Sequence, residues 1–106
     1  MPKYLLEASY TSEGLQGLTR DKATGRHEAV NRAVQAIGGK VEALYFCFGE
    51  HDVVVLMELA DNISAAAIAI RVSASGLVRT KITPLLTIDE VDKAIGKGVE
   101  YRAPGA

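Results

Sequence analysis

Two strand-like runs with only two residues between them constrain the fold most. Residues 40–48 and 51–59 are rich in Val, Tyr, Phe and Leu, and Gly49-Glu50 alone separates them. A two-residue loop with Gly first favours a type II′ hairpin turn, because Gly has no Cβ to clash at positive φ. The facing pairs expected from this turn are Phe46 with Val53, Leu44 with Val55, and Glu42 with Met57.

The two sides of the predicted hairpin differ in character. Side chains alternate between the two faces of a strand, so each face is made of every second residue. The more apolar side, which we expect beneath helices, carries Phe46, Phe48, His51, Val53, Val55 and Met57. The other side carries Tyr45, Cys47, Asp52, Val54, Leu56 and Glu58.

The segment before the hairpin predicts a strand followed by a helix. Residues 4–10 alternate between two sets of positions, as a strand does. After a short helical turn, we expect the main helix from about Thr24, ending at Gly38-Gly39. Spacings of three and four place one stripe of this helix inward, namely His27, Val30, Val34 and Ile37.

The segment after the hairpin repeats this helix and strand order. A very apolar helix is expected over residues 63–75, with Asp61 or Asn62 as its N-cap. Residues 77–86 predict the last strand, and Pro84 within it indicates a sheet edge because proline has no N–H for the ladder. A capping-box pattern, Thr87-x-x-Glu90, then opens a short C-terminal helix.

This order of elements predicts an α+β fold of the ferredoxin-like βαββαβ type. Its antiparallel sheet would carry both main helices on one face, with the short helix at the end of the chain. The other face would stay open, and its centre is too apolar for water alone. We therefore expect a second copy to cover it, giving a homodimer or higher oligomer compatible with a dimeric α+β barrel.

Length, charge and cysteine content bound the remaining classes. The 106 residues form one expected domain, 1–106, with a flexible tail from about residue 97. A net charge of −1 gives no basic excess for nucleic acid. A single cysteine and the absence of an apolar leader or membrane-length segment favour a cytoplasmic protein that binds no membrane.

Four short motifs resemble the GYD-domain family over about residues 3–95. They are Gly49-Glu50-His51-Asp52-Val53-Val54, Gly38-Gly39-Lys40, Val78-Arg79-Thr80 and Thr87-x-x-Glu90. In the family signature, Gly-x-Tyr-Asp, a tyrosine occupies the place of His51, so a role for that phenol does not carry over. The resemblance implies a small bacterial or archaeal protein with a ferredoxin-like fold and no defined activity.

The predicted connectivity gathers several polar side chains at one end of the sheet. The residues are Tyr10, His27, His51, Asp52 and Arg79, and we treat them as candidate ligand-binding residues. His51 and His27 could converge on a cleft between helix and sheet, where burial would set their protonation. The alternative is that His51 flanks the hairpin in solvent and His27 lies at the rim of the core.

The other candidate groups also keep two interpretations. Asp52 could act as a base or bind a cation, or it could accept hydrogen bonds of the turn or pair with Arg79. Arg79 could bind a substrate carboxylate or form an ion pair at an interface. Cys47 is expected to behave as a small apolar group, and no residue spacing indicates a metal ion or other cofactor.

Three functions follow from these features. The leading hypothesis is a homo-oligomeric module that binds a small molecule or regulates in response to one. The second is a cofactor-free enzyme, resembling monooxygenases or isomerases of the dimeric α+β barrel type, with proton transfer by His51, Asp52 or Tyr10. The third is a structural interaction domain whose open sheet face is its whole function.

Overall fold

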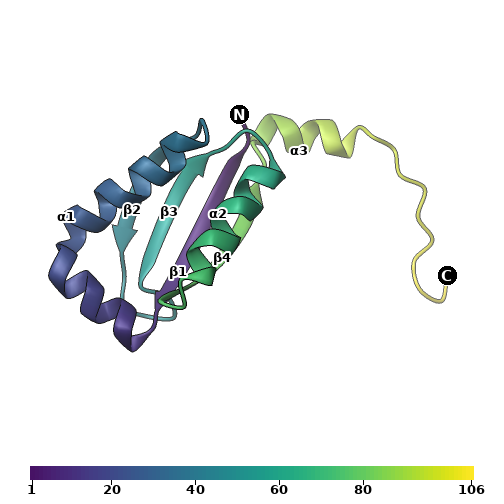
Figure 1. The fold of residues 1–106 in the computed structure, drawn as a ribbon. Helices are drawn as coiled ribbons and strands as arrows, with labels where there is room; N and C mark the ends of the chain where they lie inside the picture. Colours follow the sequence, from purple (N-terminus) through teal and green to yellow (C-terminus); the bar gives the residue numbers. More distant parts are fainter.

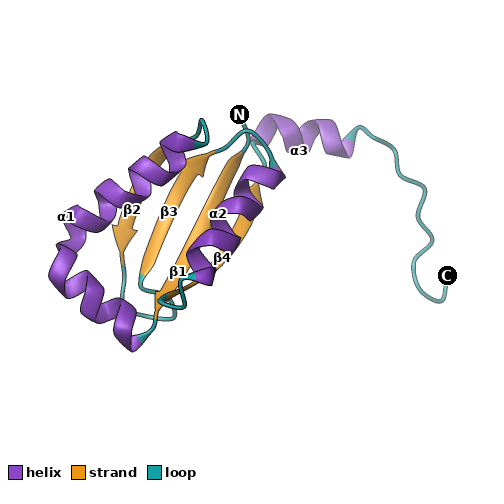
Figure 2. Cartoon of the chain, viewed as in Figure 1, coloured by secondary structure: helices purple, strands orange, loops and turns teal.

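The structure, a computed structural model, describes residues 1–106 as an α+β protein with a four-stranded antiparallel sheet and three helices (Figures 1 and 2). The elements are β1 (Lys3–Tyr10), α1 (Ser12–Ala36), β2 (Lys40–Phe46), β3 (Val53–Glu58), α2 (Asn62–Ala74), β4 (Val78–Leu85) and α3 (Ile88–Ile95). The strands lie in the order β2-β3-β1-β4. Pro84 therefore lies on an edge strand, as the sequence predicts.

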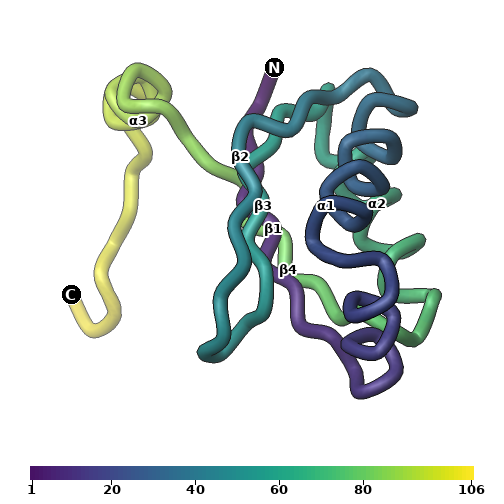
Figure 3. Tube along the Cα trace, turned by 90° about the vertical axis from the view of Figure 1, so that its left-hand side faces the viewer, coloured from purple at the N-terminus to yellow at the C-terminus, as the bar shows by residue number.

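The molecule has a helical layer on one face of the sheet only. Figure 3 shows α1 and α2 on one side of the sheet, and α3 with the C-terminal residues on the other. Alternate residues of β1 and β3 form the core beneath the helices, because strand side chains point to opposite faces in turn. The buried core consists of Tyr4, Leu6, Ala8, Val34, Val53, Val55, Met57, Leu59 and Ala65.

The register of β2 against β3 agrees with the prediction near the hairpin and departs from it further away. Phe46 pairs with Val53 and Leu44 with Val55, as expected. Further along, Val41 pairs with Met57 and Ala43 with Leu56, so Glu42 is the extra residue of a β-bulge. The predicted facing of Glu42 and Met57 is therefore wrong.

The bulge keeps a carboxylate away from the apolar side of the sheet. In the predicted register Glu42 would lie beside Met57, which is fully buried, and an unpaired carboxylate there is costly. Instead Glu42 accepts a hydrogen bond from the Lys3 ammonium group, whose Nζ is also 3.3 Å from Glu58 Oε1. This hydrogen bond lowers the pKa of Glu42 and raises that of Lys3.

The connection between β2 and β3 is a six-residue loop, 47–52, and not a type II′ turn. Gly49 does not have the positive φ that such a turn needs at its first position. The Asp52 N–H donates to the carbonyl of Ala8 (2.8 Å), and its Oδ2 accepts from the Tyr10 N–H (2.8 Å). These bonds tie the loop to β1, and Phe48 is left 99% exposed where the sequence predicted a helix-facing side chain.

Helix α1 runs from Ser12 to Ala36 and is interrupted at Lys22. The sequence predicts a short turn followed by a helix from about Thr24, and the interruption divides α1 at nearly that place. Lys22 has φ 65° and ψ 168°, a region used almost only by glycine. The backbone at Lys22 is therefore strained, and the helix changes direction at this residue.

The start of α1 packs tightly against the turn before β4. A Cβ on Gly14 would collide with the Leu77 carbonyl oxygen, so only glycine fits there without a shift. The same carbonyl accepts a hydrogen bond from the Thr11 N–H at 2.9 Å. The helical layer is therefore anchored at this end of the sheet.

The caps of α2 and α3 follow the sequence. Asp61 is the N-cap of α2 and accepts from the Ser64 N–H at 2.8 Å, which lowers the pKa of its carboxyl group. Thr87 and Glu90 form the predicted capping box of α3. The apolar residues of α3 are exposed, with Ile88 86% and Ile95 76% accessible. This helix therefore has no apolar partner within the chain.

Candidate functional site

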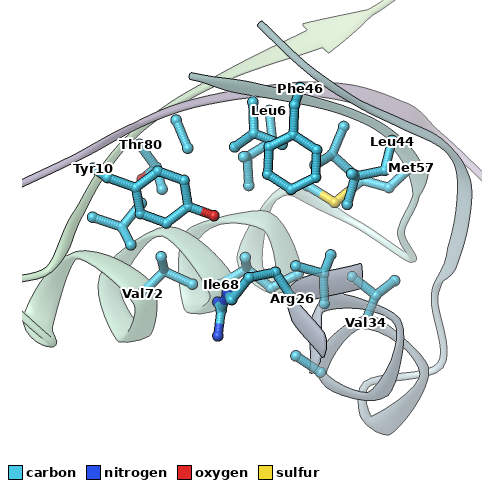
Figure 4. A pocket seen from close by; sticks show the side chains of 16 residues that line it. Leu6, Tyr10, Arg26, Val34, Leu44, Phe46, Met57, Ile68, Val72 and Thr80 are labelled. Carbon is cyan, nitrogen blue, oxygen red and sulfur yellow. The ribbon is translucent and has the colours of Figure 1, made fainter. Parts of the chain in front are cut away.

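A cavity lies between the sheet and the two covering helices. Helix α1 rests on β1 and β2, α2 rests on β4, and a groove separates the two helices. The space between them contains a cavity of about 70 Å³ (Figure 4). Its lining is mostly apolar and comes from all four strands and both helices: Leu6, Ala8, Tyr10, Arg26, Val30, Ala33, Val34, Leu44, Phe46, Val53, Val55, Met57, Ile68, Val72, Val78 and Thr80.

Few polar groups reach this cavity. Figure 4 shows the Tyr10 hydroxyl pointing into the space below Phe46, with Arg26 extending along the opposite side. The Arg26 Nε is buried and has no hydrogen-bond partner. Its Nη1 is 3.8 Å from Asp21 Oδ2, which is too far for a hydrogen bond. A buried donor without an acceptor is unusual in a folded protein.

The cavity continues toward the surface in two directions. A groove between α1 and α2 shares Ala33, Ile68 and Val72 with it. A second hollow, which we call the mouth, shares Tyr10, Arg26, Val72 and Val78 with it and adds Asp21 and Arg71. The cavity therefore has a mostly apolar approach between the helices, which Arg71 also lines, and a charged approach at the end of the sheet.

Tyr10 is the one predicted site residue that lines the cavity. It follows the alternation of β1, whose even-numbered residues from Tyr4 onward face the helices. Its backbone N–H is bonded to Asp52, so the end of β1 is held in place. The side chain lines both the cavity and the mouth.

His51 does not face the helices, and this expectation is wrong. Its Nε2 is 3.5 Å from Glu7 Oε2, and its Nδ1 is 3.3 Å from Ser9 Oγ. Glu7 and Ser9 belong to the open face, because they alternate with the buried Leu6 and Ala8. The bonds of Asp52 to β1 redirect the loop, so the two-residue turn is not available to place His51.

His27 does not converge with His51. It is exposed on α1, with Nε2 3.2 Å from the Asn31 side-chain nitrogen. The inward stripe is rotated by one residue at this point, and Arg26 takes the cavity position one turn before Val30. The predicted meeting of the two histidines in a helix-to-sheet cleft is therefore wrong.

Asp52 has a hydrogen-bonding role, but its carboxylate bonds to β1 and not to the turn or to Arg79 as predicted. Its carboxylate accepts from the backbone of Tyr10 and forms no ion pair with Arg79. Arg79 lies opposite Ser9 on β4 and makes no ion pair. It lines a polar hollow of about 240 Å³ on the open face, together with Glu7, Ser9, His51, Thr80 and Lys81.

This polar hollow has a serine, a histidine and a glutamate in a row. The imidazole of His51 lies between Ser9 and Glu7, the order of a nucleophile, a base and an orienting acid. Both contacts are long, at 3.3 and 3.5 Å, and the Ser9 hydroxyl is also 3.4 Å from the Glu50 carbonyl oxygen. The arrangement orients the imidazole and also fastens the loop to β1.

Residues that could bind a metal do not come together. No group of three or more His, Cys, Asp and Glu side chains is placed to hold an ion. The Cys47 thiol donates to the His51 carbonyl oxygen at 3.1 Å, so its contact lies within the loop. None of the three helices has the length and apolar character needed to cross a membrane.

Comparison with known families identifies the chain. A family model described as GYD domain matches residues 4–95. The chain belongs to the GYD-domain family. The match spans nearly all of the sheet and the three helices of this GYD domain, so the cavity and the polar hollow lie within it. Comparison with curated proteins gave no match.

Two arginines that the sequence motifs did not single out, Arg26 and Arg71, are part of the site of this GYD domain. Arg26 lies four residues before Val30, the spacing of one helix face, and this spacing is the signal that could have found it. Arg71 is the only charged residue of α2 and lines the mouth. An arginine on an otherwise apolar helix is a second signal of the same kind.

Proposed function

We propose that this GYD domain is a homo-oligomeric module that binds a small molecule between its sheet and its covering helices, as a carrier or as a regulatory sensor. One observation carries the proposal: an apolar cavity of about 70 Å³ lies beneath two helices that are separated by a groove. Concave, mainly apolar spaces with a few polar groups are the usual form of small-molecule sites. The groove between the helices gives a ligand an approach to the cavity from the surface.

The strand order and the one-sided helical layer support a ferredoxin-like arrangement for this module. In such an arrangement the second sheet face is free for another copy, as in a dimeric α+β barrel. The open face has an apolar centre for that contact. Its central residues are Leu5, Ala43, Tyr45, Val54 and Leu56.

The single chain exposes more surface than a compact monomer of its mass. Its accessible surface is 7614 Å², whereas a compact monomer of this mass exposes about 5,700 Å². Helix α3 and the residues after it contribute to the excess by extending away from the sheet (Figure 1). A standard interface buries about 800 Å² on each partner, so one covered face is compatible with this excess.

Sedimentation velocity at micromolar concentration tests the oligomer. We expect a dimer or larger species, and a strictly monomeric profile would contradict the proposal. Leu56→Lys on the open face should give a folded monomer, because a lysine there opposes burial against another copy. Ile63→Lys on exposed α2 is the matched control and should leave the assembly unchanged.

Closing the cavity tests ligand binding. Ala33 lines both the cavity and the groove between the helices, so Ala33→Leu should fill the entrance. We expect this variant to lose the binding of a small apolar probe, xenon, measured by chemical-shift changes of the cavity methyl groups. Ala36→Leu, on the same helix and outside the cavity, is the control. Equal binding by both variants would contradict the cavity as the site.

A second candidate function is cofactor-free proton transfer. Its support is the placement of His51 between Ser9 and Glu7 in the polar hollow. Base-promoted ring opening of 5-nitrobenzisoxazole reports proton abstraction without a cofactor. If this function holds, His51→Gln lowers the rate at least about tenfold, and His27→Gln, at the exposed histidine, leaves it unchanged. Equal rates in both variants would remove this candidate.

A further inference from the structure

The mouth of the cavity carries more positive than negative charge. It contains the guanidinium groups of Arg26 and Arg71 and the carboxylate of Asp21. Arg71 forms no ion pair, and Arg26 approaches Asp21 only to 3.8 Å. One of the Arg26 donors, Nε, is buried without an acceptor. The mouth therefore lacks an acceptor for the Arg26 Nε donor, and its two arginines outnumber its one carboxylate.

The interior behind the mouth has the opposite character. Apart from Arg26, Thr80 and the Tyr10 hydroxyl, its lining is hydrocarbon and the thioether of Met57. A ligand that satisfies both parts has an apolar body and an anionic end. Guanidinium groups bind planar carboxylates with charge-assisted hydrogen bonds, which are about twice as strong as neutral ones.

We propose that the ligand of the cavity is a small amphipathic carboxylate. Its apolar part fills the space beneath α1 and α2, and its carboxylate accepts hydrogen bonds from Arg26, with Arg71 adding positive charge alongside. The Tyr10 hydroxyl points into the same cavity and can donate a hydrogen bond to an oxygen of the ligand carboxylate. This inference rests on the proposed binding function and specifies its ligand class.

The size of the cavity limits the apolar part. At about 70 Å³ it is roughly half of the 150 Å³ of an engineered cavity that accepts benzene. A short hydrocarbon chain therefore fills the closed cavity, and a longer one extends into the groove between the helices. Affinity should rise about fourfold for each methylene that becomes buried, from propanoate through hexanoate.

Paired ligands with the same chain separate the contribution of the carboxylate from that of the hydrocarbon. Hexanoate and hexan-1-ol are titrated into the full chain at pH 7 and followed by calorimetry and by chemical shifts of the cavity methyl groups. We expect hexanoate to bind at least about tenfold more tightly, because a hydrogen bond to a charged group contributes more than a neutral one.

Substitutions of single arginines show where the carboxylate of the ligand binds. Arg26→Gln should weaken hexanoate at least about tenfold and leave hexan-1-ol nearly unchanged. Arg71→Gln should weaken hexanoate less, because Arg71 lines only the outer part. Arg32→Gln is the matched control, since Arg32 is exposed on α1 and lines neither the cavity nor the mouth. If Arg26→Gln does not fold, Arg26→Lys keeps the charge and should still weaken hexanoate, because it loses the planar fork.

The outcomes distinguish this inference from the function on which it rests. Equal affinity for hexanoate and hexan-1-ol, with no effect of Arg26→Gln on either, would overturn the carboxylate and leave apolar binding intact. Failure of hexanoate, hexan-1-ol and xenon alike to shift the cavity methyl groups would overturn the binding function itself. If Arg32→Gln loses as much hexanoate affinity as Arg26→Gln, the placement of the carboxylate at the mouth would be overturned.

Discussion

The two faces of the sheet are formed by the same strands but differ in how far their side chains are buried. On β3, Val55 and Met57 lie beneath the helices and are almost completely buried. Val54 and Leu56, which alternate with them, lie on the open face and stay partly exposed. Both sets are apolar, so residue type alone does not separate the faces. What separates them is that the chain supplies a cover, α1 and α2, for one face only.

The largest effect should come from neighbouring truncations on opposite faces. Met57→Ala should lower the free energy of unfolding by about 2–5 kcal/mol, because it leaves a void in the core. Leu56→Ala should cost the monomer less than about 1 kcal/mol, since its side chain packs on one side only. Urea denaturation of a dilute, monomeric sample measures both. Equal losses would show that the open face is packed as tightly as the covered one.

The anchor of the helical layer gives the next largest effect. Gly14→Ala should destabilise the protein by about 1–3 kcal/mol, because its Cβ collides with the Leu77 carbonyl. Gly17, three residues later in the same helix, has open space within 4 Å of the place that a Cβ would occupy, so Gly17→Ala should stabilise by about 0.5–1 kcal/mol. Thermal unfolding of both variants checks that one loses stability and the other gains it. A neutral Gly14→Ala would mean that α1 can shift without cost.

The interruption of α1 predicts an effect smaller than the loss in Gly14→Ala. Lys22→Gly should raise the free energy of unfolding by about 1 kcal/mol, because glycine relieves the unfavourable φ of 65°. Ala23→Gly, at the next residue, should lower it by a similar amount of about 1 kcal/mol, since that position is helical. Chemical denaturation measures both. A loss of stability in Lys22→Gly would contradict strain at this position.

The ion pairs of the open face should give the smallest effect, visible as a pH dependence. Lys3 lowers the folded-state pKa of Glu42 below its ordinary value of 4.5. The contribution of the ionised Glu42 to stability is therefore complete above pH 4.5 and is lost as the pH falls through the lowered pKa. The difference in Tm between wild type and Glu42→Gln should be constant from pH 7 to about 5 and then shrink on acidification. Glu28→Gln, at a carboxylate without an ion-pair partner, should show no such change.

Local sequence signals predict most of the fold. Alternation from Tyr4 to Tyr10 and the position of Pro84 correctly indicate a first strand with one buried face and an edge strand. The capping box at Thr87 and Glu90 appears as expected. Each of these features depends on residues close together in the chain, where spacing alone determines which atoms can meet.

The errors arise where distant residues decide the local structure. The loop after Phe46 is shaped by bonds from Asp52 to β1, which lies more than forty residues earlier. Glu42, the extra residue of the bulge, likewise bonds to Lys3, which is distant in the chain. His51 lies on the face opposite to the predicted one because its neighbours follow these long-range bonds, and the role of Arg26 depends on a helix rotation of one residue.

The irregular residues at the two edges of the sheet influence how copies of the chain can associate. Edge strand β2 carries the bulge at Glu42, and edge strand β4 carries Pro84, which lacks a backbone donor. Both devices discourage a strand of another molecule from extending the hydrogen-bonded ladder. Association through the broad face, as proposed above, would end with a closed particle, whereas edge pairing would continue into fibres. In the proposed oligomer, these two devices protect the sheet edges while the broad face makes the contact.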